Sequence, residues 1–176
     1  RDPTHPVLAG EHEGGDTGYK LGRSRVVYGE SFLTGPGLSR ATDEYGHGTQ
    51  VAGILAGNAW FSTGPHFTRT FRGMAPKVNL VNLRVLDATG SGSDADVIAA
   101  IDRAIQLAPT YKIRVINLSL GRPVMESYQV DPLCQAVERA WKAGLVVVVA
   151  AGNEGRNNQG GRDGYATIAS PANDPY

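Results

Sequence analysis

The sequence predicts an α/β fold in which a mostly parallel sheet is covered by helices on both faces. Three segments, 78–86, 114–120 and 145–151, have the length of strands and are dense in Val, Leu and Ile. Near-continuous apolar strands are typical of parallel sheets buried on both sides. Segments with helical spacing, 94–108 and 131–143, lie between these strands. This alternation of strand and helix favours a doubly wound sheet.

The part of the chain before the alternation is different in character. Residues 1–45 are polar and rich in Gly and Pro, with one candidate strand around Ser24–Tyr28. From Gly46 a helical pattern begins, in which apolar residues are interleaved with Gly and Ala. A helix so rich in small residues is suited to close burial rather than to a solvent face.

The helix expected at 94–108 has clear signals at both ends. Its apolar residues recur at helical spacing along one face. Ser93 or Asp94 can cap its N-terminus, since a side-chain oxygen there accepts a bond from a free backbone N–H. Proline cannot continue a helical hydrogen-bond ladder, so we expect Pro109 to close this helix.

The helix expected at 131–143 has similarly clear boundaries. Asp131 is its predicted cap, and Pro132 suits the first helical position because no backbone N–H is needed there. Gly144 is expected to stop it. Cys134, the single cysteine, lies within this helix and is interpreted as a small buried hydrophobe. One cysteine excludes an internal disulfide framework and any multi-cysteine metal site.

Length and charge exclude several classes of protein. The 176 residues suffice for one domain with a buried core, and we predict a single domain over residues 1–176. Lys plus Arg and Asp plus Glu number 17 each, so the formal net charge is zero and gives no reason to expect a nucleic acid or an anionic membrane as partner. No apolar run approaches the roughly 20 residues of a membrane-spanning helix.

The strongest chemical signal is Asp43-Glu-Tyr-Gly-His47-Gly-Thr-Gln-Val-Ala-Gly, which places a histidine on the first turn of a buried helix. The flanking glycines let other backbone approach the imidazole closely. The positive end of the helix dipole disfavours the charged ring, which suits a general base. A histidine alone is more often structural, but this whole string resembles the histidine motif of the subtilisin-like serine peptidases, the subtilase family. The resemblance implies that His47 is catalytic.

A second signal is the apolar strand that runs into Ala150-Ala-Gly-Asn153. An amide at the carboxyl edge of a sheet could donate a hydrogen bond to a developing oxyanion, although an Asn in this setting is also an ordinary turn residue. The stretch resembles the subtilase segment that supplies the oxyanion hole. The resemblance therefore implies that Asn153 stabilises the oxyanion, and that Ala151 and Gly152 line the primary pocket.

Two further stretches fit the same resemblance. Ser119-Leu120-Gly121 resembles the strand that lines the primary pocket, and Gly90-Ser91-Gly92 resembles the opposite edge strand that holds the substrate backbone. Taken alone, these would be a core strand with a glycine stop and a loop before a helix. With four motifs in order, the resemblance implies a subtilisin-like three-layer fold, incomplete in this chain.

The resemblance also predicts which catalytic partners this sequence lacks. No serine has the Gly-Thr-Ser-x-Ala context of the family's nucleophile. Asp16-Thr-Gly18 spells the aspartate motif but has no apolar strand before it, so we interpret it as a loop. The family order is aspartate, histidine, serine. We therefore expect an internal fragment of a catalytic domain, inactive alone, with the aspartate upstream and the serine downstream.

The function predicted is that of a secreted serine endopeptidase acting on proteins or peptides through an acyl-enzyme. We expect a monomer with no nucleic-acid or membrane partner and no cofactor. Subtilases often bind calcium, but no full set of oxygen ligands can be placed here, so no metal site is predicted. One alternative is a non-catalytic relative that serves as a binding or scaffold module. A nucleotide-binding domain is less favoured, since no phosphate-binding glycine loop is present.

Overall fold

The structure is a computed structural model that describes residues 24–35, 38–155 and 167–176. The chain divides into two compact units, Arg1–Gly92 and Ser93–Tyr176. Each unit contains its own pair of parallel strands. The single domain expected over residues 1–176 stays a prediction. Within the described ranges, no helix is long and apolar enough to cross a membrane.

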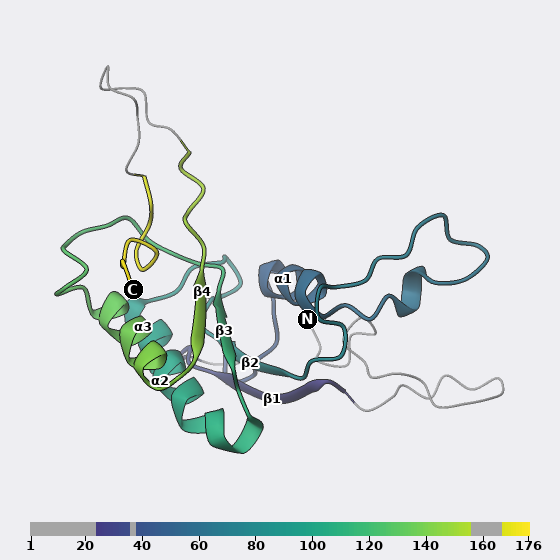
Figure 1. The fold of residues 1–176 in the computed structure, drawn as a ribbon, viewed down its shortest axis with the longest axis horizontal. Helices are drawn as coiled ribbons and strands as arrows, with labels where there is room; N and C mark the ends of the chain where they lie inside the picture. The colour runs from purple at the N-terminus through teal and green to yellow at the C-terminus, as the bar shows by residue number, and fades with distance from the viewer. Residues whose placement is uncertain (1–23, 36–37, 156–166) are drawn as a thin grey trace. The chain divides into compact units, whose positions relative to one another are not determined.

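The first unit is built on the parallel pair β1 (Val26–Ser31) and β2 (Leu80–Arg84) (Figure 1). The register runs from Val26 opposite Leu80 to Ser31 opposite Arg84, so both strands end at the same edge. Between them come α1 (His47–Ala56) and the short 3-10 helix η2 (Trp60–Ser62). The expected strand at 78–86 and the expected helix after Gly46 are both present, each slightly shorter or shifted at its ends.

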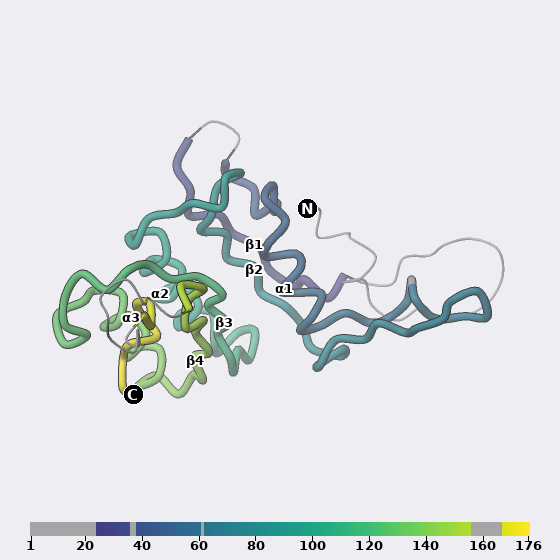
Figure 2. Tube along the Cα trace, turned by 90° about the horizontal axis from the view of Figure 1, so that it is seen from above, coloured from purple at the N-terminus to yellow at the C-terminus, as the bar shows by residue number. Residues whose placement is uncertain are grey.

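The segment that joins α1 to β2 extends away from both elements as a long loop (Figure 2). Its two arms are joined by an antiparallel bridge between Asn58 and Arg72, and the N–H of Gly73 donates to the carbonyl of Gly57 at 2.8 Å. The two arms approach each other so closely there that a Cβ added to Gly73 would lie 2.5 Å from the Gly57 nitrogen. Only glycine fits such an approach.

The second unit contains α2 (Asp94–Tyr111), β3 (Val115–Leu118), α3 (Pro132–Lys142) and β4 (Val146–Val149). Strands β3 and β4 pair in parallel along their whole length. Helix α2 packs against α3, and α3 packs against β4. The core of this unit consists of the facing apolar residues of the two helices, including Val97, Ile101, Ala104, Leu133 and Ala140.

Both helices of the second unit begin as the sequence predicts. The hydroxyl of Ser93 accepts a hydrogen bond from the N–H of Asp96, and the carboxylate of Asp131 accepts one from the N–H of Leu133. Cys134 is fully buried, which confirms its interpretation as a buried hydrophobe.

The end of α2 corrects a prediction, because Pro109 lies inside the helix instead of closing it. A proline removes one backbone N–H from the helical ladder, and in the last turn that single loss does not end the helix. The helix continues to Tyr111 and stops at Lys112, which adopts a left-handed conformation with φ of 54°. The N–H of Lys112 then donates to the carbonyl of Ala108.

Candidate active site

The turn that carries the predicted catalytic histidine is organised by Asp43. One carboxylate oxygen accepts a hydrogen bond from the N–H of Gly46 at 2.7 Å. The other accepts from the N–H of Thr49 at 2.7 Å and from its hydroxyl at 2.6 Å. Asp43 thus satisfies free N–H groups at the start of α1, the role that a capping side chain plays, although Gly46 is the formal cap residue.

These contacts favour the ionised form of Asp43. Partial burial by itself would raise the pKa of the carboxyl group. The hydrogen bonds from the Thr49 hydroxyl and from the N–H groups of Gly46 and Thr49 outweigh burial and hold that pKa below its ordinary value. The first turn of α1 is therefore anchored on an anion, which the positive end of the helix dipole also favours.

His47 occupies the first helical position of α1, inside the loop that Asp43 closes. It lines an open hollow of about 490 Å³ together with Tyr45, Gly46, Thr49 and Gln50. The imidazole is partly exposed, and within the described ranges it forms no hydrogen bond. A ring held at a rigid helix start and open on one side can exchange a proton with a group that enters the hollow.

Side chains at the carboxyl end of β2 hold the segment that leads to His47. The amide of Asn82 donates to the carbonyl of Ala41 at 2.6 Å. Arg84 is buried and forms an ion pair with Glu44 at 3.0 Å. Its Nε also donates to the carbonyl of Leu86 at 3.1 Å, on the path toward Gly90. Arg84 therefore ties the histidine loop and the Gly90 loop to one strand end.

Gly90, Ser91 and Gly92 lie at the end of a tight turn that begins at Asp87, after β2. The N–H and the carbonyl of Ser91 are both bonded to Asp87, at 3.0 and 2.8 Å. Gly90 has φ of 80°, and a Cβ added there would lie 2.8 Å from the ring of Tyr45. Two predicted parts of the site, the histidine loop and the Gly90 turn, therefore meet within the first unit through Tyr45. Gly90–Gly92 are not part of a strand in this structure, and their expected role in holding the substrate backbone stays a prediction.

The remaining predicted residues lie at the carboxyl edge of the second sheet. Because β3 and β4 are parallel and in register, Ser119–Gly121 and Ala151–Asn153 leave the pair at the same edge. Asn153 is exposed, and Gly152 before it has φ of 103°, a conformation that favours glycine. The amide of Asn117 donates to the Ser119 hydroxyl at 2.9 Å. Ligands commonly bind at such an edge in parallel α/β folds.

A third segment, residues 167–173, packs against this edge and is here called the strap. Ser170 and Arg122 form an antiparallel bridge with N–H to carbonyl distances of 2.8 and 3.0 Å. The N–H of Ala169 donates to the carbonyl of Ala151 at 2.9 Å. A Cβ added to Gly121 would lie 3.0 Å from the carbonyl oxygen of Ser170. The strap thus touches both segments predicted to bind substrate.

Sequence reasoning did not assign roles to Asp43, Arg84, Arg122 or Ser170. Asp43 had a usable signal, since it lies a few residues before a predicted helix start in a loop rich in glycine. Arg84 and Arg122 had none, because their partners are far apart in the sequence. Asp16–Gly18 lies outside the described residues.

No group of three or more His, Cys, Asp or Glu that could hold a metal ion occurs in the described ranges, and the expectation of no metal or cofactor stays a prediction.

Parallel α/β units, with a histidine at a helix start and an amide at a sheet edge, define a protein of the subtilisin-like fold class. The chain belongs to the subtilase family, whose model matches residues 2–174. The solved structure of sphericase is similar with a TM-score of 0.61 and 30% identity, covering 81% of this chain and 42% of that chain. These findings confirm the predicted family and fold class.

Named relatives agree with this assignment. The chain is 42% identical to serine protease AprX of Bacillus subtilis, over 73% of this chain and 28% of AprX. It is 37% identical to subtilisin DY of Bacillus licheniformis, over 85% of this chain and 49% of the relative. It is 38% identical to thermitase of Thermoactinomyces vulgaris, over 86% of this chain and 43% of the relative. The chain therefore spans less than half the length of these relatives.

Proposed function

We propose that the complete protein carrying this sequence is a serine endopeptidase that cleaves proteins or peptides through an acyl-enzyme. In this proposal His47 takes the proton from a serine hydroxyl and returns it to the leaving amine. Asn153 donates a hydrogen bond to the tetrahedral oxyanion. The relatives named as serine protease and subtilisins support the reaction class.

The single observation that carries the proposal is the held but open position of His47. Asp43 anchors the turn through three hydrogen bonds at 2.6 to 2.7 Å, while the ring lines an open hollow. The His47 ring is partly exposed, so its nitrogens need no protein partner. A buried histidine that only supports the fold requires fixed hydrogen bonds, because buried polar atoms are costly to leave unpaired. The described residues offer the His47 ring none.

The arrangement of the predicted substrate segments supports a peptide as substrate. Ser91 uses both its backbone groups on Asp87, and Gly90 donates its N–H to the Asp87 carbonyl at 3.1 Å. An extended peptide would therefore pair with the carbonyl of Gly90 and with the backbone of Gly92. At the other sheet, Ser119–Gly121 lies at the same strand edge as Asn153. An extended backbone bound at this edge could place its carbonyl near an amide donor.

The nucleophile and the orienting carboxylate are proposed to lie outside this sequence. No serine of the chain has the family's Gly-Thr-Ser-x-Ala context. Asp43 is a poor candidate for the orienting carboxylate, because its two oxygens bind Gly46 and Thr49. The chain by itself is therefore proposed to be inactive. Secretion, a monomeric state, and the lack of a nucleic-acid or membrane partner are further proposals, which rest on the family and on the neutral net charge.

The proposal can be tested by labelling the complete protein with a fluorophosphonate and mapping the modified peptide. We expect one serine C-terminal to this segment to be modified, and His47→Ala to reduce labelling strongly, since the hydroxyl then lacks its base. Asn153→Ala should lower kcat with little change in KM, because the oxyanion forms only after binding. A folded, complete protein that is neither labelled nor active would instead support a peptidase-like scaffold.

A further inference from the structure

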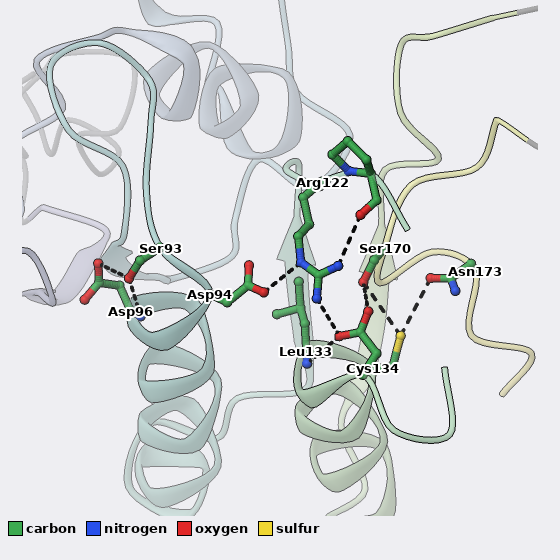
Figure 3. Close-up of polar contacts among 10 residues, drawn as sticks. Ser93, Asp94, Asp96, Arg122, Leu133, Cys134, Ser170 and Asn173 are labelled. Atoms are coloured by element: carbon green, nitrogen blue, oxygen red, sulfur yellow. Dashed lines mark hydrogen bonds and ion pairs between the residues drawn. The ribbon is translucent and has the colours of Figure 1, made fainter. Parts of the chain in front are cut away.

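We propose that Arg122, Asp131 and Ser170 form a positioning network that sets the primary substrate pocket by fixing the strap against it. The proposal rests on the proposed function, since it assigns the network a role in binding substrate. Figure 3 shows the guanidinium of Arg122 directed toward Asp94 and toward the start of α3. None of the three residues belongs to the predicted site, and all lie in the second unit.

Arg122 is the centre of the network. Its Nε donates to Asp94 at 2.7 Å, its Nη2 to Asp131 at 2.9 Å, and its Nη1 to the carbonyl of Pro123 at 3.1 Å. Asp94 and Asp131 lie at the starts of α2 and α3, so one side chain joins both helix starts. The planar guanidinium fixes the direction of each bond, which a lysine could not do.

Asp131 passes this constraint to the strap. It is fully buried, and its Oδ1 accepts from both Arg122 and the N–H of Leu133. Its Oδ2 accepts from the hydroxyl of Ser170 at 2.7 Å. Ser170 is also fully buried, and the Sγ of Cys134 lies 3.8 Å from its Oγ. A buried carboxylate requires such partners, because an unpaired buried charge is strongly unfavourable.

The strap in turn determines the space next to the predicted substrate residues. Arg122 follows Gly121 directly, and its backbone bridge to Ser170 fixes the strap beside Gly121. On the other side, Ala169 is bonded to Ala151, and a Cβ added to Gly152 would lie 3.3 Å from its Cβ. A displaced strap would therefore shift both walls that are predicted to bind substrate. Small displacements of this kind weaken catalysis through poor positioning of the substrate.

The experiment uses the complete protein and compares Arg122→Met with a matched control, Arg139→Met. Arg139 is also an arginine of the second unit in an ion pair, bonded to Asp102 at 3.0 to 3.2 Å between α3 and α2. Asp131→Asn is a second test variant, because asparagine still caps α3 but removes the negative charge opposite Arg122. Ser170→Ala is a milder third, which keeps the test available if the arginine variant does not fold.

Three measurements separate positioning from general stability. Hydrogen exchange at the N–H of Ala169 and Ser170 should accelerate by about tenfold or more in Arg122→Met, since local opening becomes easier. The second measurement uses peptide amides that differ in the side chain before the cleaved bond. In Arg122→Met, kcat/KM should fall by about tenfold, and the ratio of kcat/KM between the best and the worst peptide should decrease. Labelling by a small fluorophosphonate, which needs little of the pocket, should change by about twofold at most. Asp131→Asn and Ser170→Ala should shift exchange and discrimination in the same direction, each by about threefold or more, because each weakens or removes a hydrogen bond to the buried carboxylate.

The outcomes distinguish the two proposals. Unchanged exchange in Arg122→Met, an equal effect of Arg139→Met, or equal losses in labelling and in peptide hydrolysis would each overturn the positioning role. A folded wild-type protein that neither hydrolyses peptides nor reacts with the fluorophosphonate would overturn the proposed function and this proposal with it. Faster exchange together with selective loss of peptide discrimination supports both.

Discussion

The carboxylate of Asp43 accepts two hydrogen bonds from Thr49, one from its N–H at 2.7 Å and one from its hydroxyl at 2.6 Å. These bonds close a loop around His47, which lies between the two residues at the start of α1. The position of the His47 backbone thus depends on the side chain of Asp43. Asp43 acts as a remote cap, since the neighbouring Gly46 offers no side-chain acceptor.

Replacing Asp43 should therefore affect both stability and catalysis. We expect Asp43→Ala to lower the free energy of unfolding by about 1 kcal/mol, the usual loss for a capping side chain. It should also lower kcat, because the His47 turn loses three hydrogen bonds. Urea denaturation and peptide hydrolysis of the complete protein provide the two measurements.

Ser93→Ala is the matched control for this experiment. The Ser93 hydroxyl caps α2 through the N–H of Asp96, so its loss should lower stability by a similar amount. Because it lies outside the histidine turn, kcat should be nearly unchanged. If the two variants lower kcat equally, Asp43 contributes only stability and does not position His47.

The low pKa of Asp43 predicts a loss of stability in acid. The carboxyl group has a lower pKa in the folded than in the unfolded protein, because folding supplies the hydrogen bonds from Thr49 and Gly46. Its contribution is complete above the unfolded pKa and is lost as pH falls through the folded pKa. The urea concentration at the unfolding midpoint should therefore decrease as the pH is lowered below about 4. Asp43→Asn should reduce this dependence, and an identical pH profile for the two proteins would contradict the assignment.

The contact between Gly90 and Tyr45 predicts strong coupling between these residues. Gly90→Ala introduces a Cβ 2.8 to 3.0 Å from the Tyr45 ring, at a residue with φ of 80°. The left-handed conformation alone costs about 1 to 2 kcal/mol for alanine. We expect Gly90→Ala to lower stability and to weaken peptide binding.

A double-mutant cycle with Tyr45→Ala isolates the steric part of this effect. Removing the ring should relieve the contact but not the backbone strain, so the double variant should recover part of the lost stability. Additive effects of the two substitutions, measured by thermal or urea unfolding, would show that the ring and Gly90 are not in contact.

The elements predictable from the sequence are those set by local pattern. Strand β4 and the start of α3 follow from an unbroken apolar run and from an Asp-Pro pair. The predicted end of α2 at Pro109 was wrong, because a proline in the last turn removes only one hydrogen bond and the helix continues to Tyr111. Val115, Val146 and Val148 are at least half exposed within the second unit. Apolar residues on both sides of a strand are what a sheet covered on both faces requires.

The site was predictable only where a motif is contiguous. His47 and Asn153 each lie in a short string whose local structure follows from glycines and a strand or helix end. The network of Arg122 joins residues 28 and 9 positions away, and the strap lies still further along the chain. Such contacts depend on how the chain folds back on itself, and no periodicity or spacing around Arg122 indicates them. The same holds for Arg84, whose partner Glu44 lies 40 positions earlier.

The environment of Cys134 predicts a thiol that reacts only when the strap opens. The residue is fully buried, with its Sγ 3.8 Å from the Ser170 Oγ and 3.7 Å from the Asn173 Oδ1. Burial raises the pKa of the thiol, so the reactive thiolate is scarce at neutral pH. Alkylation by iodoacetamide at pH 7.5 should be about a hundredfold slower in the native than in the urea-unfolded protein. Mass spectrometry of the peptide that contains Cys134 measures this rate directly.

Because Ser170 belongs to the strap, Ser170→Ala should accelerate native alkylation of Cys134, whereas Arg139→Met should not. Rapid alkylation of the native wild-type protein would mean that the strap is open in solution, and the contacts of Ser170 with Asp131 and Arg122 could not then hold the pocket.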